Sequence, residues 1–312
     1  MTSQVHLYTS LPENIERIIA DVSAGFGVLY GPKAEAMYQG SGRQIFASLL
    51  QSGEVWLWGV GPFIAPQALL MARIADARGE VMFAHAFCGA PDSLCESLVA
   101  HATTELRVHG AKSILGEFVP TDQRDWAPAF ASAGYVVVQR EIMGRDVDTD
   151  LMEASDAQRA ISKRHAAGED AAMAACLIDA YRGHGDCKLH EEVRDESRAR
   201  GLFGRVISGQ AGASDPDLVR GVWRDGICIA VAAGAFAAPG VGFVLQIGVR
   251  KEFQGQGIGR RLLHEMLAHF RRYGASRVML GVTCDNPARH LYLAEGFAHV
   301  RPFTSHIWEQ AP

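Results

Sequence analysis

The residues with the clearest chemical potential form a glycine-rich loop, Gln254-Gly255-Gln256-Gly257-Ile258-Gly259. Glycine lets the backbone come close to a ligand and turn several N–H groups toward one point. An amphipathic helical pattern over Ile258–Tyr273 begins inside the loop. The N-terminus of a helix adds unpaired N–H groups and the positive end of its dipole. The loop is therefore suited to bind a phosphate or a pyrophosphate.

Four cations flank this loop and could strengthen the binding of an anion: Arg250, Lys251, Arg260 and Arg261. Two common phosphate motifs do not fit. A dinucleotide-binding fold needs G-x-G-x-x-G, whereas the spacing here is G-x-G-x-G, and a P-loop needs Gly-Lys-Ser or Gly-Lys-Thr, which occurs nowhere in the chain. The structural alternative is a strand-to-helix turn eased by glycine, with no ligand.

Predicted elements on both sides position the loop. Residues 241–249 form an apolar run typical of a strand. A helix C-cap is expected at Gly274, and residues 277–283 then follow a second strand pattern. A short helical segment follows Asn286, and a last strand closes the chain. The predicted order is strand, glycine loop, helix, strand, short helix, strand.

In this order the segments resemble the GNAT superfamily of acyl-CoA-dependent N-acyltransferases. In that family a [QR]-x-x-G-x-[GA] loop holds the cofactor pyrophosphate, and Gln254, Gly257 and Gly259 fit this pattern. A later family segment, N-x-x-A-x-x-L-Y-x-x-x-G-F, supplies an asparagine and a tyrosine. The residues in register with it are Ala288, Leu291, Tyr292, Gly296 and Phe297. Asn286 stands one residue closer to the tyrosine than the pattern asks.

The resemblance implies an N-acetyltransferase that moves an acetyl group from acetyl-CoA (coenzyme A) to a primary amine of a small molecule or peptide. The amine would attack the thioester directly, and Tyr292 would protonate the leaving thiolate. A main-chain N–H near Val249 would polarise the thioester carbonyl. The cofactor-binding residues that the resemblance implies are Ile247, Gly248, Val249, Gln254, Gly255, Gln256, Gly257, Ile258, Gly259, Arg260 and Asn286.

The group that removes the proton from the amine is left open. Many relatives carry a glutamate on the strand before the loop, but this strand has Gln246, which cannot take a proton. Water could relay the proton to a more distant group, or His184, which titrates near neutrality, could serve as the base. His184 could also be an ordinary loop histidine. Asp186, Glu191 or Glu192 could hold a cationic substrate, and Gln246 is a further substrate-binding candidate.

Other assignments of these residues also remain open. Tyr292 could be a core tyrosine, and Asn286 could cap the helix that begins at Pro287. The chain could be a non-catalytic acyl-CoA sensor that keeps the loop without turnover. A tandem chain of this length also resembles mycothiol synthase, a narrower alternative within the same chemistry.

Composition limits the partners. The chain has 312 residues, 48% of them hydrophobic, and a net charge of −5, which disfavours nucleic acid as the main partner. The six cysteines show no C-x-x-C pairing, so neither a metal site nor a disulfide framework is expected. No apolar run approaches a membrane span, and no leader is recognisable. These features lead us to expect a cytoplasmic protein without a membrane partner, and they leave the oligomeric state open.

Internal repetition indicates two copies of one fold. Residues 110–116 resemble residues 274–281, and residues 131–135 resemble residues 293–297. In each copy these two segments follow an amphipathic helix. We expect an α/β (α+β) chain with two tandem GNAT-like domains, residues 1–147 and 156–312, joined through a polar linker at 146–156. Each domain would have a mixed, mostly antiparallel central sheet flanked by helices.

The first copy lacks the chemistry of the second. Its equivalent of the glycine loop is Cys88-Gly89-Ala90-Pro91-Asp92-Ser93, in which proline removes a donor and the acidic residue repels phosphate. Phe130 stands in the place of Tyr292, and Arg124 in the place of Asn286. We therefore expect residues 1–147 to be non-catalytic and 156–312 to be catalytic.

The sequence patterns also predict the remaining elements. Expected helices in the first copy begin at Glu13 and cover 44–50 and 93–109; in the second copy they cover 169–181 and 195–208. Expected strands cover 5–9, 55–59, 68–74, 81–87, 218–223, 227–236 and 241–249.

Overall fold

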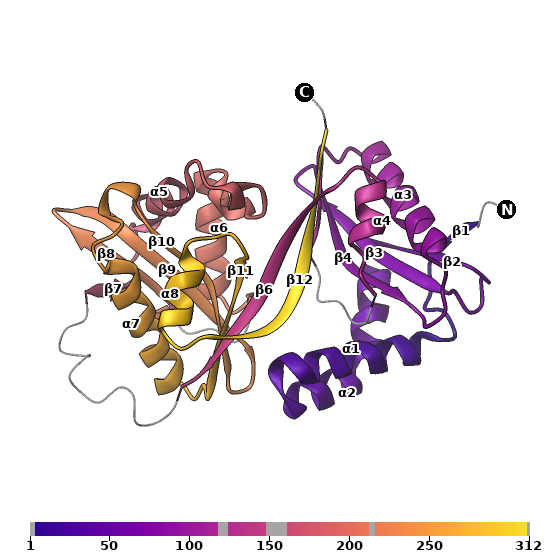
Figure 1. Ribbon diagram of the computed structural model, residues 1–312, viewed down its shortest axis with the longest axis horizontal. Coiled ribbons are helices and arrows are strands. Elements are labelled where there is room, and N and C mark those ends of the chain that lie inside the picture. Colours follow the sequence, from indigo (N-terminus) through magenta and orange to yellow (C-terminus); the bar gives the residue numbers. More distant parts are fainter. Residues whose placement is uncertain (1–3, 118–123, 148–160, 212–215, 311–312) are drawn as a thin grey trace. The chain divides into compact units, whose positions relative to one another are not determined.

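A computed structural model describes residues 4–117, 124–147, 161–211 and 216–310 (Figure 1). The chain forms two compact units, the first made of residues 1–140 with 302–312 and the second of residues 141–301. Most of the polar linker expected at 146–156 lies outside the described residues. None of the described helices has the length and apolar character that a membrane span requires.

The first unit contains a sheet with the strand order β1-β2-β3-β4-β5-β12. Its pairs are antiparallel except β4 with β5, which is parallel. Its elements are β1 (Val5–Tyr8), α1 (Ile15–Tyr30), α2 (Pro32–Ser52), β2 (Val55–Val60), β3 (Ala68–Ala75), β4 (Arg78–Ala86), α3 (Asp92–Val108), β5 (Ser113–Gly116), α4 (Ala127–Ser132) and parts of β6 (Val136–Asp146) and β12 (Ala298–Glu309).

The second unit repeats this plan with the strand order β6-β11-β10-β9-β8-β7 and a parallel pair, β10 with β11. Its further elements are β7 (Ser162–Arg164), α5 (Asp170–Tyr181), α6 (Glu196–Ile207), β8 (Val219–Arg224), β9 (Ile227–Ala238), β10 (Val241–Val249), α7 (Ile258–Arg272), β11 (Arg277–Thr283) and α8 (Ala288–Ala294). Short 3₁₀ turns cover η2 (Gly185–Lys188), η3 (Glu191–Val193), η4 (Pro216–Leu218) and η5 (Lys251–Phe253). In each unit the strands are mixed and mostly antiparallel and helices flank them, which confirms the predicted fold class.

The last strand links the second copy of the sequence to the first unit. His306–Glu309 of β12 pair antiparallel with Ser113–Gly116 of β5. Because of this pairing, residues 302–312 belong to the first unit. A division of the sequence at the linker would instead assign residues 302–312 to the second unit. The domain limits 1–147 and 156–312 stay a prediction.

One predicted helix in the first unit was much too short. The sequence pattern indicated a helix only over 44–50, whereas α2 covers Pro32–Ser52. Gly40 and Gly42 interrupt the apolar pattern there, and glycine is a poor helix former. The structure gives the reason for one of them, because a Cβ on Gly42 would lie 2.8 Å from Cγ2 of Ile19 in α1. Close packing between α1 and α2 therefore stabilises a helix that local propensity does not predict.

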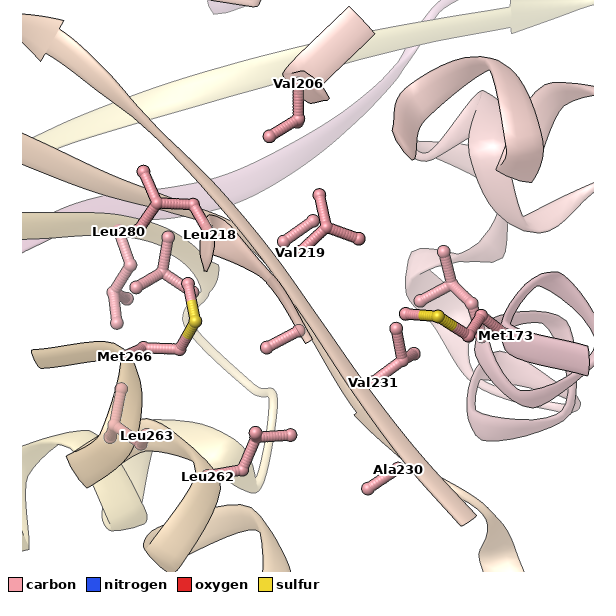
Figure 2. Close-up of a cluster of buried hydrophobic side chains, with 14 of the residues drawn as sticks. Met173, Val206, Leu218, Val219, Ala230, Val231, Leu262, Leu263, Met266 and Leu280 are labelled. Atoms are coloured by element: carbon pink, nitrogen blue, oxygen red, sulfur yellow. The ribbon is translucent and has the colours of Figure 1, made fainter. Parts of the chain in front are cut away.

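Helices cover both faces of the sheet in the second unit. Met173 of α5 lies on one side of the strands in Figure 2, and Leu262 and Met266 of α7 lie on the other; all three are fully buried. On the α7 side, a Cβ on Gly242 would lie only 2.4 Å from the ring of Phe270. Glycine at this position thus lets α7 pack closely against β10 and fixes the loop that precedes the helix.

A β-bulge in β10 changes the direction of its side chains. The register against β9 shifts between Val244 and Gln246. Before the shift, Gly242 faces Phe270 of α7; after it, Gly248 faces Ala180 of α5, 2.9 Å from the position of a Cβ. A bulge adds one residue and therefore exchanges the two faces of a strand. As a result Gln246 points toward α5 and the segment that follows it.

Candidate active site

A pocket of about 260 Å³ opens in the second unit where four segments meet. They are the end of α5 with its following loop, the end of β10, the glycine loop, and the start of α8. The lining residues are Ala180, Tyr181, His184, Ile247, Gly248, Val249, Gln254, Gly259, Asn286, Pro287, Ala288, Leu291 and Tyr292. The pocket thus brings together eight of the predicted catalytic and cofactor-binding residues: His184, Ile247, Gly248, Val249, Gln254, Gly259, Asn286 and Tyr292.

The glycine loop has the backbone geometry of an anion site. Gly255 and Gly257 adopt positive φ angles of 74° and 73°, which few other residues tolerate. Gly257 is the N-cap of α7, and no side chain among the described residues caps its N–H groups. Gln254 donates from Nε2 to the Val249 carbonyl oxygen over 3.0 Å, which holds the loop against the end of β10. The uncapped helix start and the open space at both glycines fit a pyrophosphate.

The other predicted loop residues lie beside the pocket rather than on its wall. Gly255, Gln256, Gly257, Ile258 and Arg260 do not line it. Arg260 is about half exposed, and its Nε lies 2.7 Å from Glu295 Oε1. Arg250 donates from Nε to the Cys228 carbonyl oxygen over 2.7 Å. Glu295 therefore holds Arg260 in position at the start of α7.

Tyr292 places its side chain in the pocket wall. It is buried, and its hydroxyl forms no hydrogen bond with the residues that the structure describes. Burial, together with the negative charge of Asp186, raises the pKa of Tyr292 to about 12. The hydroxyl therefore remains protonated across the neutral range and is available as a donor to a group in the pocket.

The side-chain amide of Asn286 forms hydrogen bonds with the protein at both its oxygen and its nitrogen. Its Oδ1 accepts the N–H of Ala288 over 2.8 Å and so caps α8, and its Nδ2 donates to Asp186 Oδ2, also over 2.8 Å. Asn286 lines the pocket. Asn286 thus accepts a hydrogen bond at the start of α8 and also lines the pocket. Its contact with a cofactor stays a prediction.

His184 lies in the pocket wall, but its ring is used in a turn. Its Nδ1 accepts the backbone N–H of Asp186 over 3.2 Å at the start of η2. A nitrogen that accepts an N–H carries no proton, so the neutral ring has its proton on Nε2. A proton added at Nδ1 would face the N–H of the backbone. Oδ2 of the Asp186 carboxylate lies 3.6 Å from the same Nδ1 atom. The role of His184 as the base stays a prediction.

The predicted substrate carboxylates are separated. Asp186 is buried behind Asn286, while Glu191 forms ion pairs with Nε of Arg194 at 3.2 Å and Nε of Arg198 at 3.0 Å. Neither lines the pocket. Glu191 is therefore ion-paired with two arginines of the same unit, and its contact with a substrate stays a prediction.

The comparison with known families follows this geometry. The model of the acetyltransferase (GNAT) family matches residues 177–297, which include the loop, α7, Tyr292 and most of the pocket wall. Residues 177–297 form a GNAT acetyltransferase domain. No curated protein matches the sequence of the chain.

Solved structures with the same fold extend over almost the whole chain. A GCN5-related N-acetyltransferase from Sphaerobacter thermophilus is 17% identical, with a TM-score of 0.67 over 99% of this chain and 96% of that chain. A tandem GNAT protein from the clavulanic acid biosynthesis pathway is 16% identical, with a TM-score of 0.57 over 99% of each chain. The glucosamine N-acetyltransferase region of a fungal multi-domain β-N-acetylglucosaminidase is 14% identical, with a TM-score of 0.63 over 98% of this chain and 38% of that chain. At these identities the likeness concerns the fold, a tandem GNAT arrangement.

One polar cluster of the GNAT domain was not foreseen as a unit. Gln246 is buried at its centre: its Oε1 accepts from the Tyr181 hydroxyl, and its Nε2 lies 3.0 Å from Nδ1 of His190 and donates to Glu192 Oε1. These four residues, the Gln246 cluster, come from α5, η3 with its N-cap, and β10. Glu192 and Gln246 stood among the candidates from the sequence, but no spacing rule connects them with Tyr181 and His190.

The first unit fills its equivalent loop with its own side chains. Arg124 donates to Asp92 at the start of α3 and to the Ala90 carbonyl oxygen. Pro91, the N-cap of α3, offers no N–H. An anionic side chain and its arginine partner thus occupy the place where the GNAT domain presents open backbone donors.

Proposed function

We propose that the GNAT domain transfers an acetyl group from acetyl-CoA to a primary amine of a small molecule or peptide. The observation that carries the proposal is the pocket itself. Tyr292 and residues from the bulged end of β10 and the glycine loop line one space of about 260 Å³. Acyl transfer from a thioester needs a site for the anionic cofactor, a hydrogen-bond donor to the carbonyl oxygen, here expected at the end of the strand, and a proton donor for the leaving thiolate.

Coenzyme A supplies an activated acetyl group as its thioester when it is bound. The backbone N–H groups at the start of α7 and the charge of Arg260 would hold its pyrophosphate. Ile247, Gly248 and Val249 line the pocket at the end of β10 and would orient the thioester beside them. A main-chain N–H near Val249 would stabilise negative charge on the carbonyl oxygen.

Tyr292 would supply the proton that the departing sulfur needs. Its hydroxyl keeps its proton at neutral pH because burial raises its pKa to about 12. It also lines the same pocket as Val249. A buried, protonated hydroxyl that has no hydrogen-bond partner among the described residues is suited to act as a general acid.

We further propose that residues 1–147 are a degenerate domain without catalysis and that residues 156–312 carry the reaction. The contact of Arg124 with Asp92 in the first unit supports this division. A cytoplasmic location remains part of the proposal.

A thiol-release assay with acetyl-CoA and a panel of amines tests the function. The panel should hold an alkylamine, a polyamine, an amino acid amide, a short peptide and glucosamine, which one structural neighbour is described as acetylating. The proposal expects thiol release that depends on one of these acceptors and that is lost in Tyr292→Phe. Cofactor binding without release from any acceptor would favour a sensor, and release that is independent of an amine would contradict amine acetylation.

A further inference from the structure

The hydroxyl of Tyr292 forms no hydrogen bond with the residues that the structure describes, so no polar contact of its own fixes it in the pocket. Its ring packs in the buried core of the second unit, and its position follows that of α8. This helix has seven residues, Ala288–Ala294, and a helix so short is not stable by itself. The contacts that other elements make with α8 therefore decide where the hydroxyl lies.

A buried carboxylate of β6 holds α8 one turn before the tyrosine. Glu141 is 3% exposed; its Oε1 accepts a hydrogen bond from Nε of Arg289, and its Oε2 accepts one from Nδ1 of His299 over 2.7 Å. Arg289 precedes Tyr292 by three positions, and residues three apart are neighbours on the surface of a helix. The contact with Glu141 therefore fixes the turn of α8 that leads to the tyrosine.

Glu141 is ionised in this setting. Burial alone would raise the pKa of its carboxyl, but the hydrogen bonds and charges of His299 and Arg289 hold that pKa below its ordinary value. The Arg289 side chain is 32% exposed, so its guanidinium is partly shielded from water and attracts the carboxylate more strongly than at an open surface. Loss of one partner would leave a charge in a buried position without compensation. The ion pair thus favours one position of α8 over others.

Arg145 of the same strand holds the other end of α8. It follows Glu141 by four positions, so both side chains lie on one face of β6. Its Nη1 donates to the carbonyl oxygen of Glu295 over 2.6 Å. Glu295 is the C-cap of α8, three positions after Tyr292, and its own carboxylate pairs with Nε of Arg260 at 2.7 Å. Contacts from β6 thus hold α8 one turn before and one turn after the tyrosine.

We propose that Glu141 is a positioning residue for acetyl transfer: through Arg289 it holds α8 so that the Tyr292 hydroxyl meets the leaving sulfur. This inference rests on the proposed function and on Tyr292 as its acid. In this role Glu141 contacts neither the cofactor nor the acceptor and exchanges no proton. It lies outside residues 177–297, so the sequence motifs of the GNAT domain do not include it.

A double-mutant cycle with Tyr292→Phe tests this role. Glu141→Gln keeps the size of the side chain but removes its charge. With acetyl-CoA and the fastest amine of the panel, we expect it to lower kcat by about 10-fold, because a misplaced acid is less effective. The Kd for acetyl-CoA should change by less than about 3-fold, since the glycine loop is untouched. In Tyr292→Phe the same replacement should lower kcat by less than about 2-fold, because no hydroxyl is left to misplace.

Variants of the partner residue give a second, independent readout. Arg289→Gln breaks the same ion pair from the side of α8, and its loss of kcat should depend on the Tyr292 hydroxyl in the same way. Arg289→Lys keeps a cation beside the carboxylate and should recover most of kcat.

Glu265→Gln is the matched control. Glu265 of α7 is also a shielded carboxylate, 11% exposed, but it accepts the backbone N–H of Ile161 over 2.6 Å and that of Ser162 over 3.1 Å instead of a group on α8. Its replacement should change kcat by the same factor with and without the Tyr292 hydroxyl.

The outcomes separate the inference from the function. Equal losses of kcat in Glu141→Gln with and without the Tyr292 hydroxyl, or an unchanged kcat, would overturn the positioning role while leaving acetyl transfer intact. If Glu141→Gln does not fold, the cycle with Arg289→Gln decides by the same criterion. Acetyl-CoA binding without thiol release from any amine in the wild type would overturn the proposed function and the inference together.

Discussion

Asn286 donates a hydrogen bond from Nδ2 to Oδ2 of Asp186 over 2.8 Å, across 100 positions of sequence. The contact ties the turn after α5 to the first residues of α8, the helix that carries Tyr292. It also shows what the displaced asparagine does in this chain. With Oδ1 capping α8, its amide is used by the protein at both ends.

This contact predicts different effects for two replacements of Asp186. Asp186→Ala leaves a half-buried amide without its acceptor, which should lower the free energy of unfolding by about 1–3 kcal/mol. Asp186→Asn keeps an acceptor oxygen and should stay close to wild type. Urea unfolding of both variants measures the difference. Equal stability of Asp186→Ala and Asp186→Asn would show that the hydrogen bond contributes nothing.

The charge of Asp186 should also be visible in the titration of Tyr292. A nearby negative charge disfavours the tyrosinate and so raises the pKa, to which burial is the larger contributor. In Asp186→Asn the pKa of Tyr292 should fall below about 12, yet stay above its ordinary value. Difference absorbance between this variant and the same variant with Tyr292→Phe isolates the one tyrosine. An unchanged titration would contradict the electrostatic link.

Tyr292→Phe should separate chemistry from binding. Loss of the hydroxyl removes the proposed acid, so we expect kcat to fall by about 100-fold, within the range of general-acid effects. The ring still fills its buried position, so the affinity for coenzyme A should change little. Steady-state kinetics and calorimetry measure the two quantities. Unchanged turnover would remove the tyrosine from the chemistry.

The first unit should lose stability in mild acid because of His306. The ring is buried, stacks on Phe130 with centroids 4.0 Å apart, and shares a hydrogen bond with the Gly116 carbonyl oxygen. Burial lowers its pKa from 6.5 to about 4. Between these two values the unfolded chain binds more protons than the folded one, so stability falls as the pH drops below 6.5.

The expected loss for this group is about 3 kcal/mol at pH 4 relative to pH 7. Urea unfolding of wild type and His306→Asn at both pH values gives the measurement. The variant should lose that much less stability on acidification. The same pH dependence in both proteins would mean that His306 is protonated without cost.

The sequence predicts the local parts of the site well. The glycine loop, the helix α7 and the position of Tyr292 follow from short-range spacing, because glycine geometry and helix periodicity are local properties. The bulge in β10 and the cluster around Gln246 do not follow in this way. His190 and Glu192 meet Gln246 across 56 and 54 positions of sequence, and only the path of the chain brings them together.

Two features of the first unit illustrate the same limit. The length of α2 depends on the close approach of Ile19 to Gly42, a tertiary contact that overrides a weak local pattern. The end of β12 joins β5, and nothing in the spacing of a tandem repeat indicates that residues 306–309 pair with 113–116.

The central claim is that the glycine loop of the GNAT domain holds the cofactor, and calorimetric titration of the full chain with acetyl-CoA tests it most directly. Gly257→Asp should abolish binding, because the added carboxylate repels a pyrophosphate. Gly53→Asp is the matched control: both glycines have nearly the same backbone conformation, with φ, ψ of 73°, 4° and 71°, 4°, and open space at the Cβ position. The backbone strain is therefore alike, about 1–2 kcal/mol. We predict one site in the wild type and in Gly53→Asp, and none in Gly257→Asp; wild-type affinity in a folded Gly257→Asp would contradict the account.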